Sequence, residues 1–165
     1  MLSAASKNAN DDEAKELRRT SELYVKLGRA LSQGTAPATK SVDAYDYLVQ
    51  ASNYDRSLGN AFNDDISTKL AQVAPKAAAS YIAAKNFQSA RNAILTAERY
   101  GSGDSGDVKL VRQKLESVAS AIYADASKEI TSNPTAAKEK LKQIKQMVDT
   151  KSPWYIKAQK LLQGG

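Results

Sequence analysis

The segment AYDYLVQA at residues 44–51 decides the fold, because its pattern returns twice along the chain. It recurs as ARNAILTA at residues 90–97 and as AKEKLKQI at residues 137–144, after intervals of 46 and then 47 residues. In each segment a small residue is followed by a large apolar residue four positions later and another apolar residue three positions after that. This spacing puts the three side chains on one face of a helix. Its recurrence at a near-constant period predicts an array of helical repeats that bury this face against one another.

Start and stop signals between these segments predict seven helices and an all-α fold. Asn133-Pro134 and Ser152-Pro153 each place a capping side chain before a proline, which is a strong helix start. Pro75 lies within the third expected helix and should kink or split it. We expect helices from Asn10 to Gly34, from Thr39 or Ser41 to about Gly59, from Asn63 or Asp64 to Ala84, and over residues 87–97, 108–130, 134–148 and 153–162. They pair as three hairpins, and the seventh helix caps the last one.

The composition sets the domain organisation and argues against catalysis. A chain of 165 residues fits a single domain, expected over residues 10–163, after a flexible segment at residues 1–9. The sequence has no cysteine and no histidine, so thiol chemistry, the commonest general base and the commonest transition-metal ligand are all absent. We therefore expect a protein that is not an enzyme, with no metal, cofactor or small-molecule substrate.

The six excess positive charges are concentrated in the C-terminal third. Residues 1–107 carry 13 basic and 13 acidic side chains, whereas residues 108–165 carry 11 basic and 5 acidic ones. Lys138, Lys142 and Lys145 fall on one face of an expected helix, beside its inward stripe. They form either a surface for an anionic partner or an ordinary solvated face.

Residues of the second repeat resemble the signature of the tetratricopeptide repeat (TPR) family. The resemblance rests on six positions: Ala78, Tyr81, Phe87, Ala90, Ile94 and Ala97. The turn at residues 85–86 also lies where that family places its turn, while the interval of 46–47 residues exceeds the family's usual 34. The chain thus resembles a degenerate TPR-like array over roughly residues 20–162.

The resemblance implies a right-handed superhelix whose first helices line a concave groove for a peptide or helix of a partner protein. Carried over by position, the groove residues of the first repeat would be Val25, Arg29 and Ser32. Those of the second repeat would be Ala79, Ile82 and Ala83, and the third repeat receives no assignment.

The tyrosines divide into expected core and expected surface residues. Tyr24 lies on the stripe of the first helix that also holds Leu17 and Leu27, so we expect it to be buried. Tyr47 and Tyr54 lie off the inward stripe of the second helix and share one face. They are candidates for a surface contact.

The tetrapeptide Gly103-Asp104-Ser105-Gly106 matches the nucleophile motif of trypsin-like proteases. Such a serine needs a base to take its proton, and the chain has no histidine. A turn in which Asp104 or Ser105 caps the following helix is the better interpretation.

Two functional hypotheses follow from these patterns. The first is a scaffold or adaptor that binds a peptide or helix of another protein. The alternative is an electrostatic tether to anionic lipid or nucleic acid through the C-terminal lysines. Self-association through the first hairpin is a further expected partnership. With no targeting segment in the sequence, we expect a cytoplasmic protein or a soluble piece of a longer secreted or membrane-anchored one.

Overall fold

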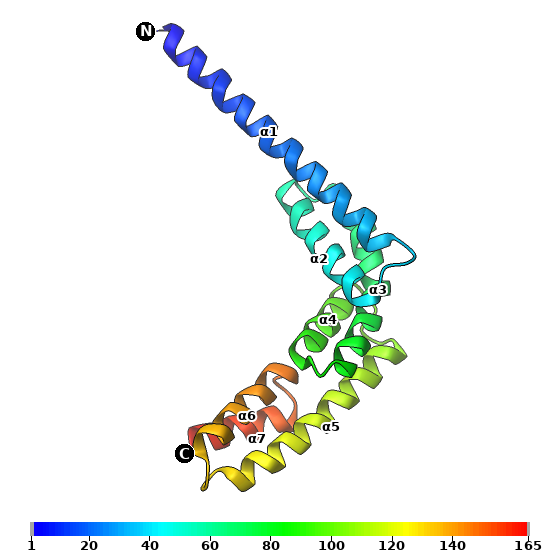
Figure 1. The fold of residues 1–165 in the computed structure, drawn as a ribbon, viewed down its shortest axis with the longest axis vertical. Helices are drawn as coiled ribbons and strands as arrows, with labels where there is room; N and C mark the ends of the chain where they lie inside the picture. The colour runs from blue at the N-terminus through cyan, green and yellow to red at the C-terminus, as the bar shows by residue number, and fades with distance from the viewer. Residues whose placement is uncertain (1, 165) are drawn as a thin grey trace. The chain divides into compact units, whose positions relative to one another are not determined.

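The computed structural model describes the backbone of residues 2–164 and the side chains of residues 11–164, and this part of the chain is all-α without strands (Figure 1). All seven expected helices are present. They are α1 (Leu2–Thr35), α2 (Ser41–Ser57), α3 (Asn63–Ala83), α4 (Phe87–Arg99), α5 (Gly106–Glu129), α6 (Pro134–Met147) and α7 (Pro153–Gln163). None of them, within the residues described, is long and apolar enough to cross a membrane.

Short polar side chains begin most of the later helices. The side chains of Asn86, Ser105, Asn133 and Ser152 each accept a hydrogen bond from a backbone N–H in the first turn of the following helix. The two starts expected before Pro134 and Pro153 are therefore confirmed. Helix α2 begins at Ser41, one of the two expected starts, but its N-cap is Lys40, whose side chain makes no capping hydrogen bond.

The chain clusters into two compact units, residues 1–70 and 71–165, whereas the sequence predicts one domain over residues 10–163. The boundary lies inside α3, between Leu70 and Ala71. Pro75 stands four residues after Ala71 and lacks the N–H that would bond the Ala71 carbonyl. The helix is not split there, since α3 continues to Ala83.

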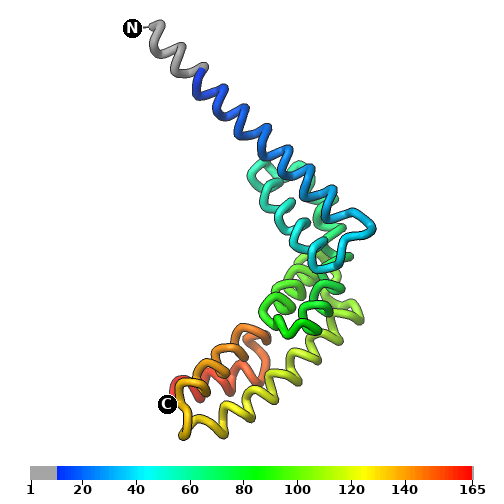
Figure 2. Tube along the Cα trace, viewed as in Figure 1, coloured from blue at the N-terminus to red at the C-terminus, as the bar shows by residue number. Residues whose placement is uncertain are grey.

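The first unit is built on the antiparallel pair α1 and α2, which lie side by side and are joined by residues 36–40 (Figure 2). Leu27 and Ala30 of α1 and Leu48 of α2 are buried in this pair. Gly34 does not end α1 as the sequence suggested, because the helix continues through Thr35. A Cβ on Gly34 would lie 2.8 Å from Leu48 Cγ, so this glycine permits close helix packing.

The expected inward stripe of α1 is only partly correct. Leu27 is buried, but Leu17 and Tyr24 are 69% and 46% exposed. The helix has 34 residues and α2 has 17, and α1 runs past the end of α2 in Figure 1. At 1.5 Å per residue this length difference is about 25 Å of helix. Leu17 therefore has no α2 residue to pack on, and the packed face is rotated toward Leu23, Leu27 and Ala30.

In the second unit α4, α6 and α7 each pack against α5, and α6 also packs against α4 and against α7. Its apolar core takes small and large residues from every helix, including Ile94 of α4, Val111 and Leu115 of α5, Leu141 of α6 and Ala158 of α7. Ala90 and Ala137, the first residues of the second and third repeated segments, are fully buried. The repeated face found in the sequence is thus a core face in this unit.

Candidate functional site

The three predicted groove residues of the first repeat lie on one face of α1. Val25 is 53% exposed, and Arg29 and Ser32 are also exposed. Leu17 and Tyr24 are exposed on the same helix, so three large apolar side chains of α1 are exposed within little more than two turns. Exposed large apolar side chains that lie this near to one another are a candidate contact area.

Ser32 and the predicted surface aromatic Tyr47 line the same hollow in the first unit, although the sequence analysis treats them separately. The hollow lies at the turn between α1 and α2 and has a volume of about 440 Å³. Its other lining residues are Gln33, Ala36, Ala38, Thr39, Lys40 and Asp43. Tyr54 is half-buried on α2 and does not line this hollow.

The three predicted groove residues of the second repeat lie near the end of α3, in the second unit. Ala79 and Ala83 are exposed, and Ile82 is half-buried. They share one helical face, as the sequence predicts. Because they belong to a different unit from Val25, Arg29 and Ser32, the two sets are described as separate surfaces.

The lysine surface of α6 is partly neutralised within the chain. Lys142 donates to Glu139 at 2.6 Å, and the ammonium of Lys145 lies 5.2 Å from the centre of the Tyr155 ring. Lys138 is half-buried and makes no ion pair within the described residues. Of the three lysines, only Lys142 has an acidic partner within the described residues.

A cluster of aromatic rings and lysines between α5 and α7 was not predicted from the sequence. The rings of Tyr123 and Trp154 are 5.7 Å apart and tilted by 46°. The ammonium of Lys157 lies 4.4 Å from the centre of the Trp154 ring and 6.0 Å from that of Tyr123. The contacts of Trp154 and Lys157 with Tyr123 join α7 to α5, and the Lys157 charge is favoured near the ring faces.

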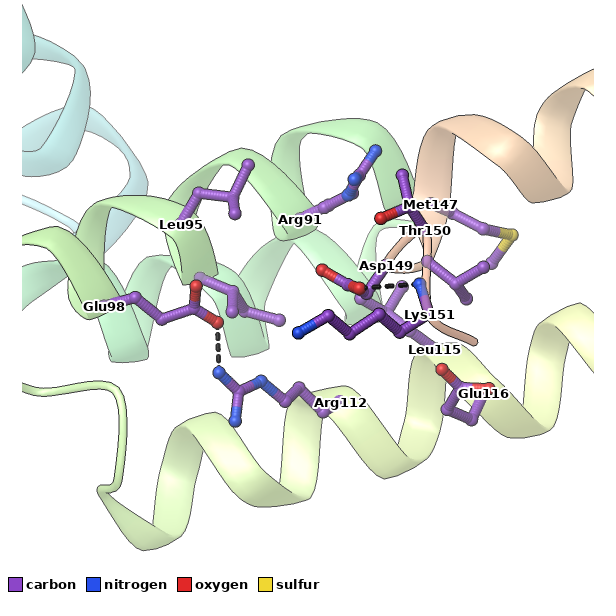
Figure 3. Close-up of a pocket in the computed structure, with 12 residues that line it drawn as sticks. Arg91, Leu95, Glu98, Arg112, Leu115, Glu116, Met147, Asp149, Thr150 and Lys151 are labelled. Atoms are coloured by element: carbon purple, nitrogen blue, oxygen red, sulfur yellow. Dashed lines mark hydrogen bonds and ion pairs between the residues drawn. The ribbon is translucent and has the colours of Figure 1, made fainter. Parts of the chain in front are cut away.

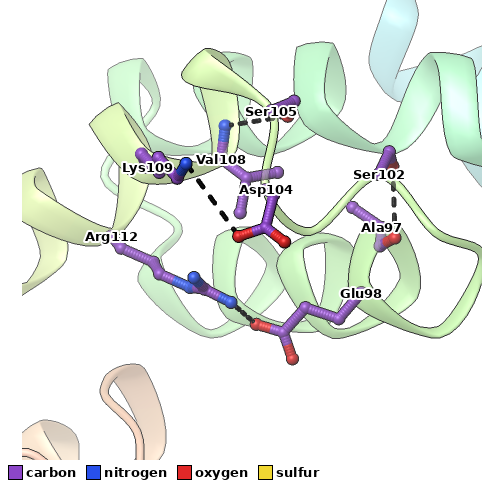
Figure 4. Close-up of polar contacts among 8 residues, drawn as sticks. All are labelled: Ala97, Glu98, Ser102, Asp104, Ser105, Val108, Lys109 and Arg112. Atoms are coloured by element: carbon purple, nitrogen blue, oxygen red, sulfur yellow. Dashed lines mark hydrogen bonds and ion pairs between the residues drawn. The ribbon is translucent and has the colours of Figure 1, made fainter.

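The 103–106 turn performs the capping role that its sequence suggested (Figure 4). Ser105 accepts a hydrogen bond from the Val108 N–H at 3.3 Å. Asp104 lies 3.9 Å from the Lys109 ammonium. Arg112 forms an ion pair with Glu98, which connects α5 to the end of α4. Ser105 is thus the N-cap of α5.

The best-formed cavity of the second unit lies between α4, α5 and the loop joining α6 to α7, with a volume of about 390 Å³ (Figure 3). Its apolar lining comes from Ile94, Leu95, Leu115, Met147 and Val148. Its charged lining consists of Arg91, Arg112 and Lys151 together with Glu98, Glu116 and Asp149. This site was not predicted from the sequence, because its residues come from three separate segments, none of which contains a motif.

Each carboxylate of this cavity has a hydrogen-bond donor from the chain. Glu98 pairs with Arg112, Glu116 accepts from the Ser152 hydroxyl at 2.8 Å, and Asp149 accepts from the Lys151 backbone N–H at 2.8 Å. Within the described residues, no cluster of three acidic, histidine or cysteine side chains could hold a metal ion.

No protein-family model, curated protein or solved structure matches this chain.

Ser152 connects Glu116 of this cavity to the start of α7, and removing its hydroxyl should destabilise the second unit. Its oxygen donates to Glu116 and accepts from the Trp154 N–H at 3.2 Å. Ser152→Ala should lower the free energy of unfolding by about 1–2 kcal/mol, because a helix cap and a buried hydrogen bond are both lost. Urea unfolding followed by the fluorescence of Trp154, the chain's single tryptophan, measures this loss. Ser127→Ala, which removes an exposed hydroxyl bonded within α5, should cost less than about 0.5 kcal/mol.

Proposed function

We propose that the chain is a non-enzymatic scaffold that binds a helix or peptide of a partner protein, and that it is built from TPR-like helical hairpins. The observation that carries this proposal is the exposed apolar face of α1. Leu17, Tyr24 and Val25 are between 46% and 69% exposed on a helix whose neighbour α2 covers another face. Burying a large apolar side chain contributes about 1.5–3 kcal/mol, so a partner that covered these three would gain substantial affinity.

The small residues on this face favour a helix as the occupant. Ser21 and Gly28 alternate with Leu17 and Tyr24 along α1, at positions that share one side of the helix. No atom lies within 4 Å of the position that a Gly28 Cβ would take, so the space above this glycine is open. Alternating large and small side chains form the ridges and grooves in which a second helix packs.

A single charged residue at the edge of this surface, Arg29, would orient the partner. Arg29 is exposed on the same side of α1 as Val25 and Ser32 and makes no ion pair within the described residues. Its guanidinium is available to a carboxylate at the edge of the contact, where it would select a partner more than strengthen binding.

The test is an affinity capture from source lysate, washed at low and high salt and read by mass spectrometry. The wild-type chain should retain a discrete protein at high salt, and Leu17→Asp combined with Val25→Asp should lose it. Each aspartate places a charge in the apolar contact, so we expect retention to fall at least about tenfold.

Lys26→Asp is the matched control, since it introduces the same side chain on the opposite, exposed side of α1. Circular dichroism checks that all variants keep their helix content. Equal capture by the wild type and the double variant would contradict the proposal. Captured polyanions that are lost at high salt would instead favour the tether through Lys138, Lys142 and Lys145.

A further inference from the structure

We propose that the 390 Å³ cavity of the second unit binds a peptide segment that presents one acidic side chain beside a large apolar side chain. This inference rests on the proposed function, because its occupant is a segment of a partner protein. It goes beyond that function in assigning a second contact site and the chemistry that the site accepts.

Two basic side chains of the cavity have no carboxylate partner within the described residues, namely Lys151 and Arg91. Lys151 extends its ammonium into the cavity in Figure 3 and has no ion pair or side-chain hydrogen bond within residues 11–164. Arg91 donates only to the backbone carbonyls of Lys145 and Gln146, both at 3.4 Å, and has no carboxylate partner. The three carboxylates of the cavity already accept hydrogen bonds from the chain. The Lys151 ammonium is thus the charged group of the cavity that has no partner from the described chain, and a carboxylate of a ligand would form the strongest hydrogen bond with it.

The apolar residues that line the cavity indicate that the ligand also carries an apolar side chain. Leu95 is exposed at the edge of the cavity, above the buried side chains of Ile94, Leu115 and Met147. A leucine-sized side chain of the ligand would be buried from water there, while the ligand's neighbouring carboxylate contacts the Lys151 ammonium. The volume lies within the usual range of about 300–1,000 Å³ for sites that enclose small groups.

The balance of charges argues against a polyanion. The cavity has three basic and three acidic side chains, so it has no excess positive field to attract a phosphate chain. One unpaired ammonium above an apolar floor fits a single carboxylate with an apolar body. An acidic side chain next to an aliphatic residue in a peptide has this chemistry.

The probe is the blocked dipeptide acetyl-Leu-Glu-amide, titrated into the full chain and followed by amide chemical shifts in ¹H–¹⁵N NMR spectra. We expect a dissociation constant on the order of 1 mM, with the shifts concentrated at Leu95, Leu115 and Lys151. Acetyl-Leu-Gln-amide lacks the charge and acetyl-Gly-Glu-amide lacks the apolar side chain, so each should bind about tenfold more weakly.

Two variants of the cavity should move the affinity in opposite directions. Lys151→Met keeps the side-chain length without the charge and should weaken binding about tenfold. Asp149→Asn keeps the oxygen that accepts from the Lys151 N–H and removes a negative charge, so it should tighten binding about threefold. Lys160→Met, on an exposed lysine of α7 outside the cavity, should leave the affinity unchanged. A gain of affinity in Asp149→Asn cannot arise from misfolding.

The proposal is overturned if Lys151→Met binds as tightly as the wild type, if the glutamine probe equals the glutamate probe, or if the shifts map elsewhere. Its failure is separable from failure of the proposed function. If the α1 double variant loses the captured protein while the dipeptide fails to bind, the scaffold stands and the cavity assignment falls. If the dipeptide binds while the α1 variant captures normally, the α1 contact is wrong and the cavity remains a binding site.

Discussion

Leu48→Ala is expected to destabilise the first unit by about 2–5 kcal/mol, the largest effect of any single change considered for this chain. Leu48 is fully buried between α2 and the last turns of α1. Truncation removes its apolar contacts and leaves a cavity that the two helices can fill only in part. Urea unfolding followed by circular dichroism measures the loss.

Substitution of Gly34 tests the packing of α1 on Leu48 from the opposite side of the contact. Gly34→Ala should destabilise by about 1–3 kcal/mol although alanine is the better helix former, since the new Cβ would lie 2.8 Å from Leu48 Cγ and 3.2 Å from the Ala44 carbonyl oxygen. Gly28→Ala, at an open position of the same helix, should instead stabilise by about 0.5–1 kcal/mol. Both glycines lie in α1, but the new Cβ meets Leu48 and Ala44 at position 34 and open space at position 28.

The double variant Gly34→Ala with Leu48→Ala tests whether the two residues contact as described. When Leu48 is shortened, the methyl group at position 34 has room. The double variant should therefore lose about 0.5–3 kcal/mol less unfolding free energy than the two single variants lose together. Additive losses would contradict the packing of α1 on α2 at Leu48.

The core was predictable from the sequence where its pattern is local. The apolar positions of the three repeated segments are all buried: Ala44, Leu48, Ala51, Ala90, Ile94, Ala97, Ala137, Leu141 and Ile144. Which residues share a face within two helical turns depends only on the 3.6-residue helical period, so the spacing of apolar residues in the sequence is enough to predict that face. The caps at Asn133 and Ser152 were predictable for the same reason, because a cap and its helix are adjacent in the chain.

The exposed face of α1 and the cavity of the second unit depend on distances between segments, which a single sequence does not contain. Tyr24 matches an inward stripe, and its exposure follows from the position and length of α2. Nothing in the sequence distinguished Lys151 from the other C-terminal lysines. Leu95 and Leu115, which line the cavity with it, are 56 and 36 residues earlier in the chain. Gly34 was interpreted as a helix end because its packing neighbour Leu48 lies in another helix.

Asp55 has the second large expected effect, because it is a buried acid that organises a turn. It is 1% exposed, and its carboxylate accepts the Phe62 N–H at 3.0 Å. Its backbone carbonyl accepts the N–H groups of Leu58 and Asn60, both at 2.9 Å. Asn60 has a φ of 63°, so the turn between α2 and α3 holds a conformation that non-glycine residues rarely adopt. The Asp55 side chain offsets that strain by bonding the far side of the turn.

Asp55→Ala should therefore destabilise the chain by about 1–3 kcal/mol, since the Phe62 N–H loses its acceptor in a part-buried position. Asp55→Asn is the matched control: its side-chain oxygen can still accept that N–H, so the loss should stay below about 1 kcal/mol. Urea unfolding compares the two variants, and amide hydrogen exchange at Phe62 reports the bond itself, with faster exchange expected only in Asp55→Ala. If both substitutions cost the same, the negative charge of Asp55 would matter more than the hydrogen bond to Phe62. If neither changed stability or exchange, the role of this carboxylate in holding the turn would be wrong.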